Sequence, residues 1–286
     1  MKMLEKPEWL KRTYREDPNL KYVREMLSNL HLNTICDEAM CPNFVDCFSK
    51  KTATFMILGV NCTRNCRFCN VTNSEPQKID ADEPNRIAEA VSKLGLKYVV
   101  ITSVTRDDLP DGGAAHFAAT IRAIHALTPN TAVEVLIPDL LGNQDALKAV
   151  IDARPEVISH NIETVKELYD QVRPQAIYER SLQVLKSIKE LAPDIRSKTG
   201  IMLGLGETAE QIYRVFNDLR DVNCEFLTIG QYLAPSSAHY PVQEYVTPEE
   251  FDRYGQIAKE KGFAFVASAP FVRSSYNASE ALAAEA

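Results

Sequence analysis

The chain has 286 residues, of which 45% are hydrophobic and 25% charged, and its formal net charge at pH 7 is −7. This length can bury a large core and fits one α/β barrel, and the composition is ordinary for a globular enzyme. The negative charge disfavours nucleic acid as a partner, and no apolar run is long enough to span a bilayer, so no membrane partner is expected.

Short apolar runs alternate with amphipathic segments along most of the chain. Strands are expected at 54–59, 98–104, 132–137, 157–161, 195–203, 226–232 and 263–267, and helices at 83–94, 114–127, 144–151, 165–169, 178–191, 209–219 and 248–261. Strand-then-helix alternation favours a parallel sheet with helical crossovers. The strands lack clean alternation, as expected when both faces are covered. Six to seven βα units predict an α/β fold, an incomplete barrel of the TIM type.

The two ends of the chain are expected to form extensions. Residues 1–50 precede the first expected strand, carry three cysteines and are predicted to cover the barrel mouth. Residues 51–269 form the barrel, and residues 270–286 are predicted to return to the mouth. The Ala/Glu-rich tail at 278–286 is expected to be frayed.

Three cysteines form a compact C-x3-C-x2-C motif at Cys62, Cys66 and Cys69. Three thiolates on one loop can hold three corners of a four-iron cluster, whereas bacterial ferredoxins normally supply a fourth. With three cysteines, the fourth iron has no thiolate ligand and is open to another molecule. This open iron indicates a reaction at the metal and not electron storage alone. This loop resembles the signature of the radical S-adenosylmethionine (radical SAM) enzymes, in which the open iron chelates the amino and carboxylate groups of SAM.

A second triplet lies upstream at Cys36, Cys41 and Cys47, with the spacing C-x4-C-x5-C. Taken alone, it fits either a zinc site with a fourth ligand or an iron–sulfur cluster. Disulfides are disfavoured because cysteines are few and no signal peptide is visible. The remaining Cys224 is expected to be a small buried hydrophobe.

Together the two triplets resemble the lipoyl synthase family. Further short runs match in order and spacing; these are 7–10, 41–43, 102–113, 160–165, 200–207 and 273–276. The resemblance implies a partial (β/α)6 barrel, two 4Fe-4S clusters and SAM. It also implies sulfurtransferase activity, the insertion of two sulfur atoms at C6 and C8 of a protein-bound octanoyl-lysine. The auxiliary cluster at the upstream triplet would be the sulfur donor, and a 5′-deoxyadenosyl radical would remove the hydrogens.

The resemblance also sets expectations for partners. The substrate carrier would be the glycine cleavage H protein or a lipoyl domain of a 2-oxoacid dehydrogenase. Ferredoxin or flavodoxin would supply electrons, and an iron–sulfur carrier would renew the consumed cluster. A monomer in the cytoplasm is expected, since unoxidised cluster cysteines fit a reducing compartment. A processed organelle form would have the same sequence features.

Several residues at expected strand ends suit SAM. Phe68 is a candidate wall for the adenine or a core aromatic, and Gly112 and Gly113 allow close backbone approach or form a turn. Asn161 and Glu163 suit ribose hydroxyls, and Arg173 suits the SAM carboxylate or a solvated helix end.

Other polar residues have plainer readings. Lys198 is expected to meet a carboxylate or to pair with Glu163 or Glu207, and His160 is expected to be a core histidine. The charge run 106–108 is expected to be solvated. The family resemblance points to Ser275 as the fourth ligand of the upstream cluster, whereas a turn role is the plain alternative.

Two other functions remain open from the sequence. One is a different radical SAM enzyme similar to biotin synthase. Such an enzyme would share the downstream triplet, but it would not combine the upstream triplet with the run 273–276. The other is a non-enzymatic iron–sulfur or zinc protein. Metal content and SAM cleavage discriminate between them.

Overall fold

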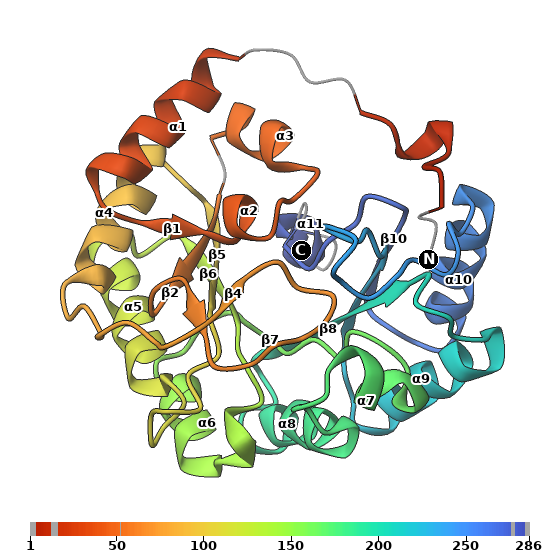
Figure 1. Cartoon of the computed structure of the whole chain (residues 1–286). Helices are drawn as coiled ribbons and strands as arrows, with labels where there is room; N and C mark the ends of the chain where they lie inside the picture. The colour runs from red at the N-terminus through yellow and green to blue at the C-terminus, as the bar shows by residue number, and fades with distance from the viewer. Residues whose placement is uncertain (1–3, 13–16, 52, 276–277, 284–286) are drawn as a thin grey trace. The chain divides into compact units, whose positions relative to one another are not determined.

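A computed structural model describes residues 4–12, 17–51, 53–275 and 278–283 (Figure 1). The chain divides into two compact parts. The first, called here the N-terminal part, comprises residues 13–64 and 70–158. The second, called the C-terminal part, comprises residues 1–12, 65–69 and 159–286.

The N-terminal part alternates strands and helices after a helical beginning. Its elements are α1 (Pro18–Asn29), β1 (Asn33–Thr34), α2 (Ile35–Glu38), α3 (Phe44–Ser49), β2 (Thr54–Ile57), β3 (Asn61–Cys62), β4 (Thr72–Asn73), α4 (Glu83–Leu94), β5 (Tyr98–Ser103), α5 (Ala114–Leu127), β6 (Ala132–Leu136), η2 (Leu140–Gly142) and α6 (Gln144–Ile151). Strand β2 pairs in parallel with β5, and β5 with β6, while β1 pairs antiparallel with β2. Helix α5 packs against both α4 and α6, and the three lie outside these strands in Figure 1.

The C-terminal part continues the same alternation. Strand β7 (Val157–Ser159) lies at the boundary between the parts and is followed by η3 (Lys166–Leu168), α7 (Tyr169–Val172), α8 (Tyr178–Leu191), β8 (Arg196–Leu203), α9 (Ala209–Asp221), β9 (Phe226–Gln231), α10 (Pro248–Glu260), β10 (Phe265–Ser268) and α11 (Ser279–Ala283); η1 (Glu8–Leu10) also belongs here. Strand β9 pairs in parallel with β8 and β10. All six β9 residues are buried, as predicted for strands covered on both faces.

Local sequence signals explain where the helices begin and end. Helix α4 has Pro84 in its first turn and ends at Gly95, whose φ of 65° is the left-handed conformation that glycine adopts without strain. Thr208 and Gln211 form a reciprocal capping box at the start of α9. Helix α10 is capped by Thr247, whose hydroxyl accepts from the Glu250 amide.

The parallel β/α alternation confirms the predicted fold class, a partial (β/α)6 barrel of the TIM type. Strand β10 adds a parallel strand beyond six. Four predicted helices, at 83–94, 114–127, 144–151 and 178–191, have the observed bounds. Strand β2 ends earlier than predicted because Leu58 and Gly59 have φ values of 69° and 90°.

Three local expectations were wrong or incomplete. The helix expected at 165–169 is instead the 3-10 turn η3 followed by α7. The tail expected to be frayed contains α11, in which Ala281 is only 1% exposed. Residues 1–50 were expected to contain no strand, but β1 forms there and extends the sheet at β2.

Candidate active site

The sulfur of Cys62 accepts two backbone hydrogen bonds. The amides of Thr105 and Arg64 donate to Cys62 Sγ at 3.3 and 3.4 Å. Thr105 follows β5, so the end of that strand reaches the cysteine loop directly. Amide donors around a sulfur stabilise negative charge on it, which suits a thiolate that binds metal.

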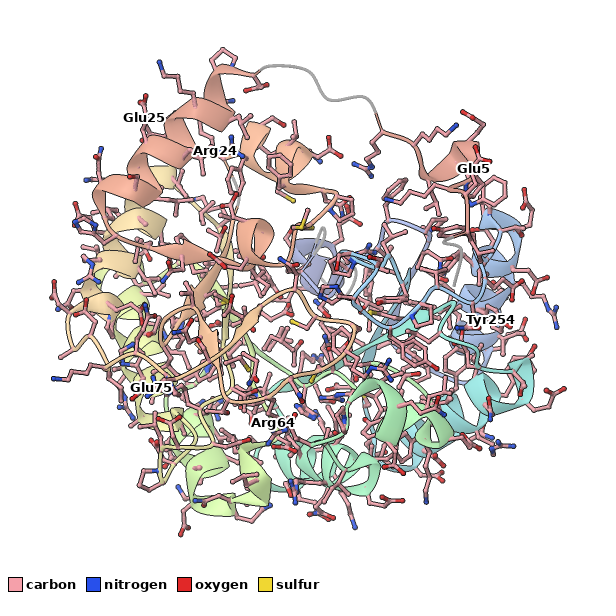
Figure 2. All side chains as sticks on the ribbon, in the orientation of Figure 1. Glu5, Arg24, Glu25, Arg64, Glu75 and Tyr254 are labelled. Carbon is pink, nitrogen blue, oxygen red and sulfur yellow. The ribbon has the colours of Figure 1, made fainter. Side chains whose placement is uncertain are left out.

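Arg64, which is labelled in Figure 2 and lies between the first two cysteines of the motif, is 5% exposed and contacts two carboxylates. Its Nε and Nη2 donate to the two oxygens of Asp107 at 2.7 and 2.9 Å, and Nη2 also donates to Asp139 at 2.6 Å. Burial alone would lower the pKa of Arg64, but the two carboxylates raise it overall. The sequence reasoning missed this role; the available signal was an arginine inside the motif with an aspartate after each of two strands.

The charge run at 106–108 was expected to be solvated, which is wrong for Arg106 but agrees with Asp108, whose side chain is 36% exposed. Arg106 is only 3% exposed. Its Nε and Nη2 donate to the two oxygens of Asp108, and Nη1 donates to the carbonyl of Leu58. The acidic partner lies only two residues away, but its position in the chain does not show that the arginine side chain turns towards the interior.

The second half of the cysteine loop belongs to the C-terminal part. The Cys69 amide donates to the Cys66 carbonyl at 3.0 Å. The Arg67 amide donates to the Val172 carbonyl, the Arg67 carbonyl accepts from the Tyr240 amide, and the guanidinium of Arg67 lies 5.2 Å from the centre of the Tyr240 ring. Three contacts therefore hold this half of the loop from both sides of Arg67.

Phe68 is partly buried against the cluster of Val172, Leu205, Tyr232 and Tyr240. The Tyr232 hydroxyl donates to the Tyr240 carbonyl at 2.6 Å, which fixes this aromatic surface. These contacts account for Phe68 as a core aromatic, one of the two readings left open by the sequence. Its contact with adenine stays a prediction.

Asn161, Glu163 and Arg173 lie close together after β7. The Asn161 amide donates to Glu163 Oε1 at 3.1 Å. Arg173 Nη1 donates to the carbonyls of Asn161 and Ile162 and to the Tyr169 hydroxyl. Burial raises the pKa of the Glu163 carboxyl, against the opposing effects of Arg173 and Asn161.

The guanidinium of Arg173 is buried, and among the described residues its Nε has no hydrogen-bond partner. Its hydrogen bonds to described residues all come from Nη1, and its buried Nε has none. Burial would lower the pKa of Arg173, but Tyr169, Glu163 and Cys66 together raise it. The carbonyl of the preceding residue, Val172, accepts from the Arg67 amide at 2.9 Å, so this arginine lies beside the cysteine loop. It is therefore not the solvated helix end that was its alternative reading.

Gly112 and Gly113 have a structural explanation that needs no ligand. Their φ values are 61° and 91°, and Gly113 caps the start of α5. A Cβ on Gly113 would lie 2.3 Å from a side-chain carbon of Leu58, and one on Gly112 would lie 3.0 Å from Leu140. The turn reading is thus supported, and contact with SAM stays a prediction.

The upstream triplet lies on and between α2 and α3. Cys36 is buried, whereas Cys41 and Cys47 are half-buried. The Cys41 amide donates to the Cys36 carbonyl at 3.0 Å, so one short turn joins the first two cysteines. Burial raises the pKa of the Cys36 thiol to about 12, with a backbone hydrogen bond to Thr54 acting in the opposite direction.

The upstream triplet also contacts the segment that follows Cys69. The Asn70 side-chain amide donates to the carbonyl of Glu38, at the end of α2, at 2.8 Å. Asn70 is the first residue after the downstream motif. One hydrogen bond within the N-terminal part therefore connects the neighbourhoods of the two triplets.

The C-terminal run at 273–276 lies partly outside the described residues, because Tyr276 is not described. Ser275 is half-buried. Its neighbour Ser274 donates to Asn161 Oδ1 at 2.8 Å. A Cβ on Gly230 would lie 2.1 Å from the Val272 carbonyl, so this segment packs closely on β9.

The remaining candidates have structural partners. Lys198 is 1% exposed on β8, and the His160 ring bonds Ser181 at 3.0 Å as a core histidine would. Glu207 accepts the amides of Gly204 and Leu205, so its carboxylate holds that turn. Burial raises the pKa of Glu207. Cys224 is fully buried, as predicted.

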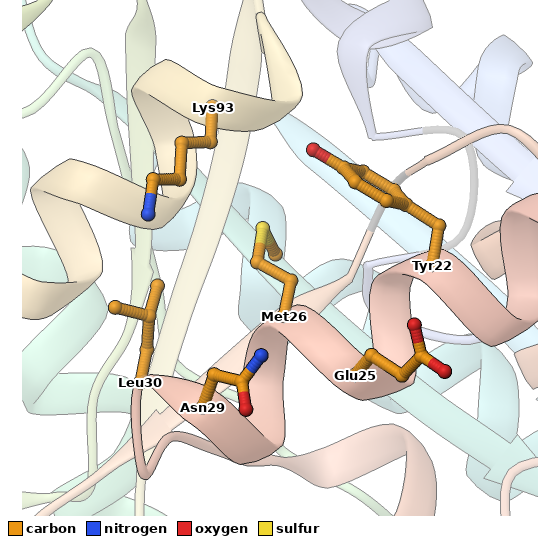
Figure 3. Close-up of a pocket in the computed structure, with 6 residues that line it drawn as sticks. All are labelled: Tyr22, Glu25, Met26, Asn29, Leu30 and Lys93. Atoms are coloured by element: carbon orange, nitrogen blue, oxygen red, sulfur yellow. The ribbon is translucent and has the colours of Figure 1, made fainter.

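A surface pocket lies between α1 and α4 in the N-terminal part (Figure 3). Its lining residues are Tyr22, Glu25, Met26, Asn29, Leu30 and Lys93. The two charged residues are already paired, Glu25 with Lys21 and Lys93 with Glu89. No residue from the predicted site lines this pocket, so it adds no chemistry to the cysteine motifs.

The chemistry of the cysteines suits the clusters that the family resemblance implies, although among the described residues no three His, Cys, Asp or Glu side chains are grouped as a metal site requires. All seven are free thiols, and the three of the downstream motif are half-buried rather than sealed in the core. The two amide donors to Cys62 Sγ match the surroundings of an iron-bound thiolate. Within the described residues, no helix has the length and apolar character to cross a lipid bilayer.

Comparisons with known proteins identify relatives over nearly the whole chain. The family model described as the radical SAM superfamily matches residues 56–219. A lipoyl synthase of Alkaliphilus metalliredigens is 55% identical over 282 residues, covering 99% of this chain and 97% of the relative. A lipoyl synthase of Caldanaerobacter subterraneus subsp. tengcongensis is 57% identical, covering 96% of this chain and 95% of the relative.

Solved structures support the fold. Streptococcus suis SuiB bound to S-adenosylmethionine has a TM-score of 0.59 at 12% identity, covering 79% of this chain and 54% of SuiB. HydG, a maturase of the [FeFe]-hydrogenase, has a TM-score of 0.59 at 15% identity, covering 87% of this chain and 63% of HydG. The chain thus spans little more than half the length of SuiB, and these likenesses bear on the fold alone. From the full-length relatives, the chain belongs to the lipoyl synthase family of the radical SAM superfamily.

Proposed function

We propose that the chain inserts two sulfur atoms, at C6 and C8, into an octanoyl chain that is amide-linked to a lysine of a small carrier protein. The observation that carries this proposal is the full-length match to lipoyl synthases together with both cysteine triplets. When bound, SAM and the two 4Fe-4S clusters supply the hydrogen-abstracting radical and the sulfur. The protein's own task is to hold ligands, exclude water and align the chain.

In this proposal Cys62, Cys66 and Cys69 hold the cluster that binds SAM. The two amides that point at Cys62 Sγ support its role as a thiolate ligand. Three thiolates leave one iron for the amino and carboxylate groups of SAM.

Arg173 is the proposed partner of the SAM carboxylate. Its unpaired Nε belongs to the edge of the guanidinium that can bind a carboxylate with two parallel hydrogen bonds. The remaining nitrogen, Nη1, is used to fix the side chain on three protein oxygens. A guanidinium fixed in this way loses little further freedom when the ligand binds.

Other SAM contacts are proposed for the residues beside Arg173 and in the cysteine loop. Asn161 and Glu163 would bond the ribose hydroxyls, Phe68 would contact the adenine, and the backbone at Gly112 and Gly113 would meet the amino group. The hydrogen bond between Asn161 and Glu163 supports a joint role. Glu163 has a φ of 66°, which few non-glycine residues adopt. Backbone conformations of this unusual kind cluster at functional sites.

The upstream cluster is proposed to be held by Cys36, Cys41, Cys47 and Ser275. A serine oxygen is a harder and weaker partner for iron than a thiolate. A ligand that releases easily suits a cluster that gives up sulfur. On this proposal, residues 1–50 carry the donor cluster, residues 51–269 form the barrel, and residues 270–286 supply the serine.

The carrier is proposed to be the glycine cleavage H protein or a lipoyl domain of a 2-oxoacid dehydrogenase. Ferredoxin or flavodoxin would donate electrons, and an iron–sulfur carrier would rebuild the upstream cluster. The free cysteines suit a reducing compartment, which supports the cytoplasm as the location.

The test is product analysis on anaerobically purified chain. Two clusters predict about eight irons and about eight sulfides per chain. With SAM, reductant and an octanoyl-lysine peptide, we expect 5′-deoxyadenosine, methionine and a peptide that has gained two sulfur atoms. Zinc in place of iron, or SAM cleavage without any sulfur-containing product, contradicts the proposal.

A further inference from the structure

Two groups of contacts fasten the segment Cys62–Arg64 to the loop after β5. Backbone and hydroxyl contacts form the first group: Thr63 donates to the Thr105 carbonyl through both its amide and its hydroxyl, and the Asp107 amide donates to the Thr63 hydroxyl at 3.1 Å. The side-chain fork from Arg64 to Asp107 forms the second group. Each of the two segments, 63–64 and 105–107, thus donates hydrogen bonds to the other.

The same two segments carry both amide donors to the cysteine sulfur. Thr105 donates to Cys62 Sγ from one segment and Arg64 from the other. At 3.3 and 3.4 Å, these N–H···S bonds depend on the separation and angle of the segments. The Arg64–Asp107 fork joins the two segments through a planar guanidinium, and the arginine side chain is only 4% exposed.

Asp139 connects Arg64 to a third loop. Its side chain is 1% exposed and accepts from Arg64 Nη2, while the Leu141 amide donates to the same carboxylate oxygen. Asp139 caps η2 in the loop that follows β6. Arg64 therefore joins the cysteine loop to the ends of two neighbouring strands, β5 and β6.

We propose that the triad of buried Arg64, half-buried Asp107 and buried Asp139 is a positioning element that aims the two backbone amides at Cys62 Sγ and thereby sets the reduction potential of the cluster held by Cys62, Cys66 and Cys69. An external reductant delivers one electron, which adds negative charge that the sulfurs share. Amide donors stabilise this charge, so well-aimed amides raise the potential and misdirected amides lower it. No bond to iron is made or broken in this step.

The neighbouring pair Arg106–Asp108 supplies a matched control. It has the same two-bond fork, and its arginine side chain is also 4% exposed. Arg106 donates to the Leu58 carbonyl rather than to residues 62–64. Replacing either arginine by lysine keeps the positive charge and removes the two parallel hydrogen bonds. Both variants therefore leave the net charge around the cluster unchanged and differ in which contacts they remove.

The experiment is a redox titration monitored by electron paramagnetic resonance. The full chain carries Cys36→Ala, Cys41→Ala and Cys47→Ala, so only the downstream cluster contributes. Arg64→Lys is expected to lower the midpoint potential by about 59 mV or more, a tenfold fall in the ratio of reduced to oxidised cluster at fixed potential. Thr63→Val, which removes the bridging hydroxyl without changing charge, is expected to lower it in the same direction. Arg106→Lys is expected to leave it unchanged.

The outcomes separate this inference from the cluster assignment on which it rests. If the parent chain binds no iron, and Cys62→Ala makes no difference to iron content, the proposed ligands are wrong. If iron binds normally but Arg64→Lys and Thr63→Val both keep the parent potential, the positioning role is wrong. An equal shift in Arg106→Lys also overturns it. If Arg64→Lys does not retain iron, the potential of Thr63→Val decides.

Discussion

Ser274 donates a hydrogen bond to Asn161 Oδ1 at 2.8 Å, although the two residues are 113 positions apart. The contact joins the C-terminal run to the group that also contains Glu163 and Arg173. It is possible because β8 has a glycine at Gly200: a Cβ there would lie 3.0 Å from both Asn161 Oδ1 and Ser274 Oγ. Ser274 is therefore tied to the proposed SAM-binding residues, while the proposed cluster ligand is its neighbour.

Ser275 substitutions test the fourth ligand of the upstream cluster. Ser275→Ala is expected to assemble both clusters, since three thiolates provide most of the binding, yet to lose sulfur insertion. Ser275→Cys is expected to hold its iron more tightly because thiolate is the softer ligand, so it should cleave SAM but insert sulfur slowly or not at all. The measurements are iron content, 5′-deoxyadenosine and sulfur-containing peptide.

Ser274→Ala is the informative comparison for that series. Ser274 orients Asn161, so its loss is expected to raise KM for SAM while leaving sulfur insertion possible at saturating SAM. Full sulfur insertion by both Ser275 variants would refute the ligand role and leave Ser275 as a turn residue.

Single cysteine substitutions separate the roles of the two triplets. Cys69→Ala is expected to abolish SAM cleavage because the cluster with the open iron is lost. Cys41→Ala is expected to retain some SAM cleavage but to form no sulfur-containing product. Cys224→Ala, at the cysteine outside both triplets, is expected to keep both activities. Sulfur insertion by Cys41→Ala would show that the donor assignment is wrong.

Arg173→Lys tests the proposed carboxylate contact. Lysine keeps the charge but cannot form two parallel hydrogen bonds, and each charged hydrogen bond contributes about 1.5–3 kcal/mol. The dissociation constant for SAM, measured by equilibrium dialysis on cluster-loaded chain, is expected to rise about tenfold to a hundredfold. Arg214→Lys alters a half-exposed pair with Glu167 and is expected to change nothing. An unchanged SAM affinity in Arg173→Lys would remove Arg173 from the site.

The form of the substrate gives a further functional prediction. Octanoyl-lysine peptides are expected to be turned over, whereas free octanoate is expected to react poorly. The formal net charge of −7 opposes the approach of a free anion and not of a neutral amide-linked chain. Turnover is measured as 5′-deoxyadenosine and sulfur-containing product from each substrate at equal concentration. Equal turnover of the free acid would contradict this expectation.

Glu225 gives a stability prediction that is independent of the clusters. It accepts from Lys189 Nζ at 2.7 Å, from the Ser197 amide at 3.0 Å and from Arg196. Burial acts to raise the pKa of Glu225, but these hydrogen bonds outweigh it and the net pKa is lowered. Glu225→Gln is expected to lower the free energy of unfolding at pH 7 by about 1–3 kcal/mol, measured by urea denaturation.

The pH dependence of that difference follows from the lowered pKa. A carboxyl with a lower pKa in the folded state stabilises the protein above its unfolded pKa of about 4.3, and this contribution is lost as the pH falls further towards the folded-state value. The free energies of unfolding of the parent chain and of Glu225→Gln should therefore converge as the pH falls below about 4.3. Glu190→Gln, in an exposed pair with Lys186, is the control with little expected effect. A constant difference across the pH range would contradict the assignment.

Much of the fold could be predicted because strong local signals coincide with the elements. Helix α4 has a proline in its first turn and a glycine directly after its last residue, and its bounds were predicted correctly. The strand ends were less certain, since β2 stops where Leu58 and Gly59 adopt positive φ. Helix α11 was missed because its few residues gain stability from packing, as the 1% exposure of Ala281 shows.

The sequence by itself determined the cysteine triplets, the α/β alternation and the family resemblance, because spacing along the chain and periodicity are local properties. Only the tertiary structure decided which charged residues are buried together. Arg64, Asp107 and Asp139 come from three loops, and their pairing arises because parallel strands end at the same edge. The Ser274–Asn161 bond likewise required folding, since close approach across Gly200 depends on distances that no local pattern encodes.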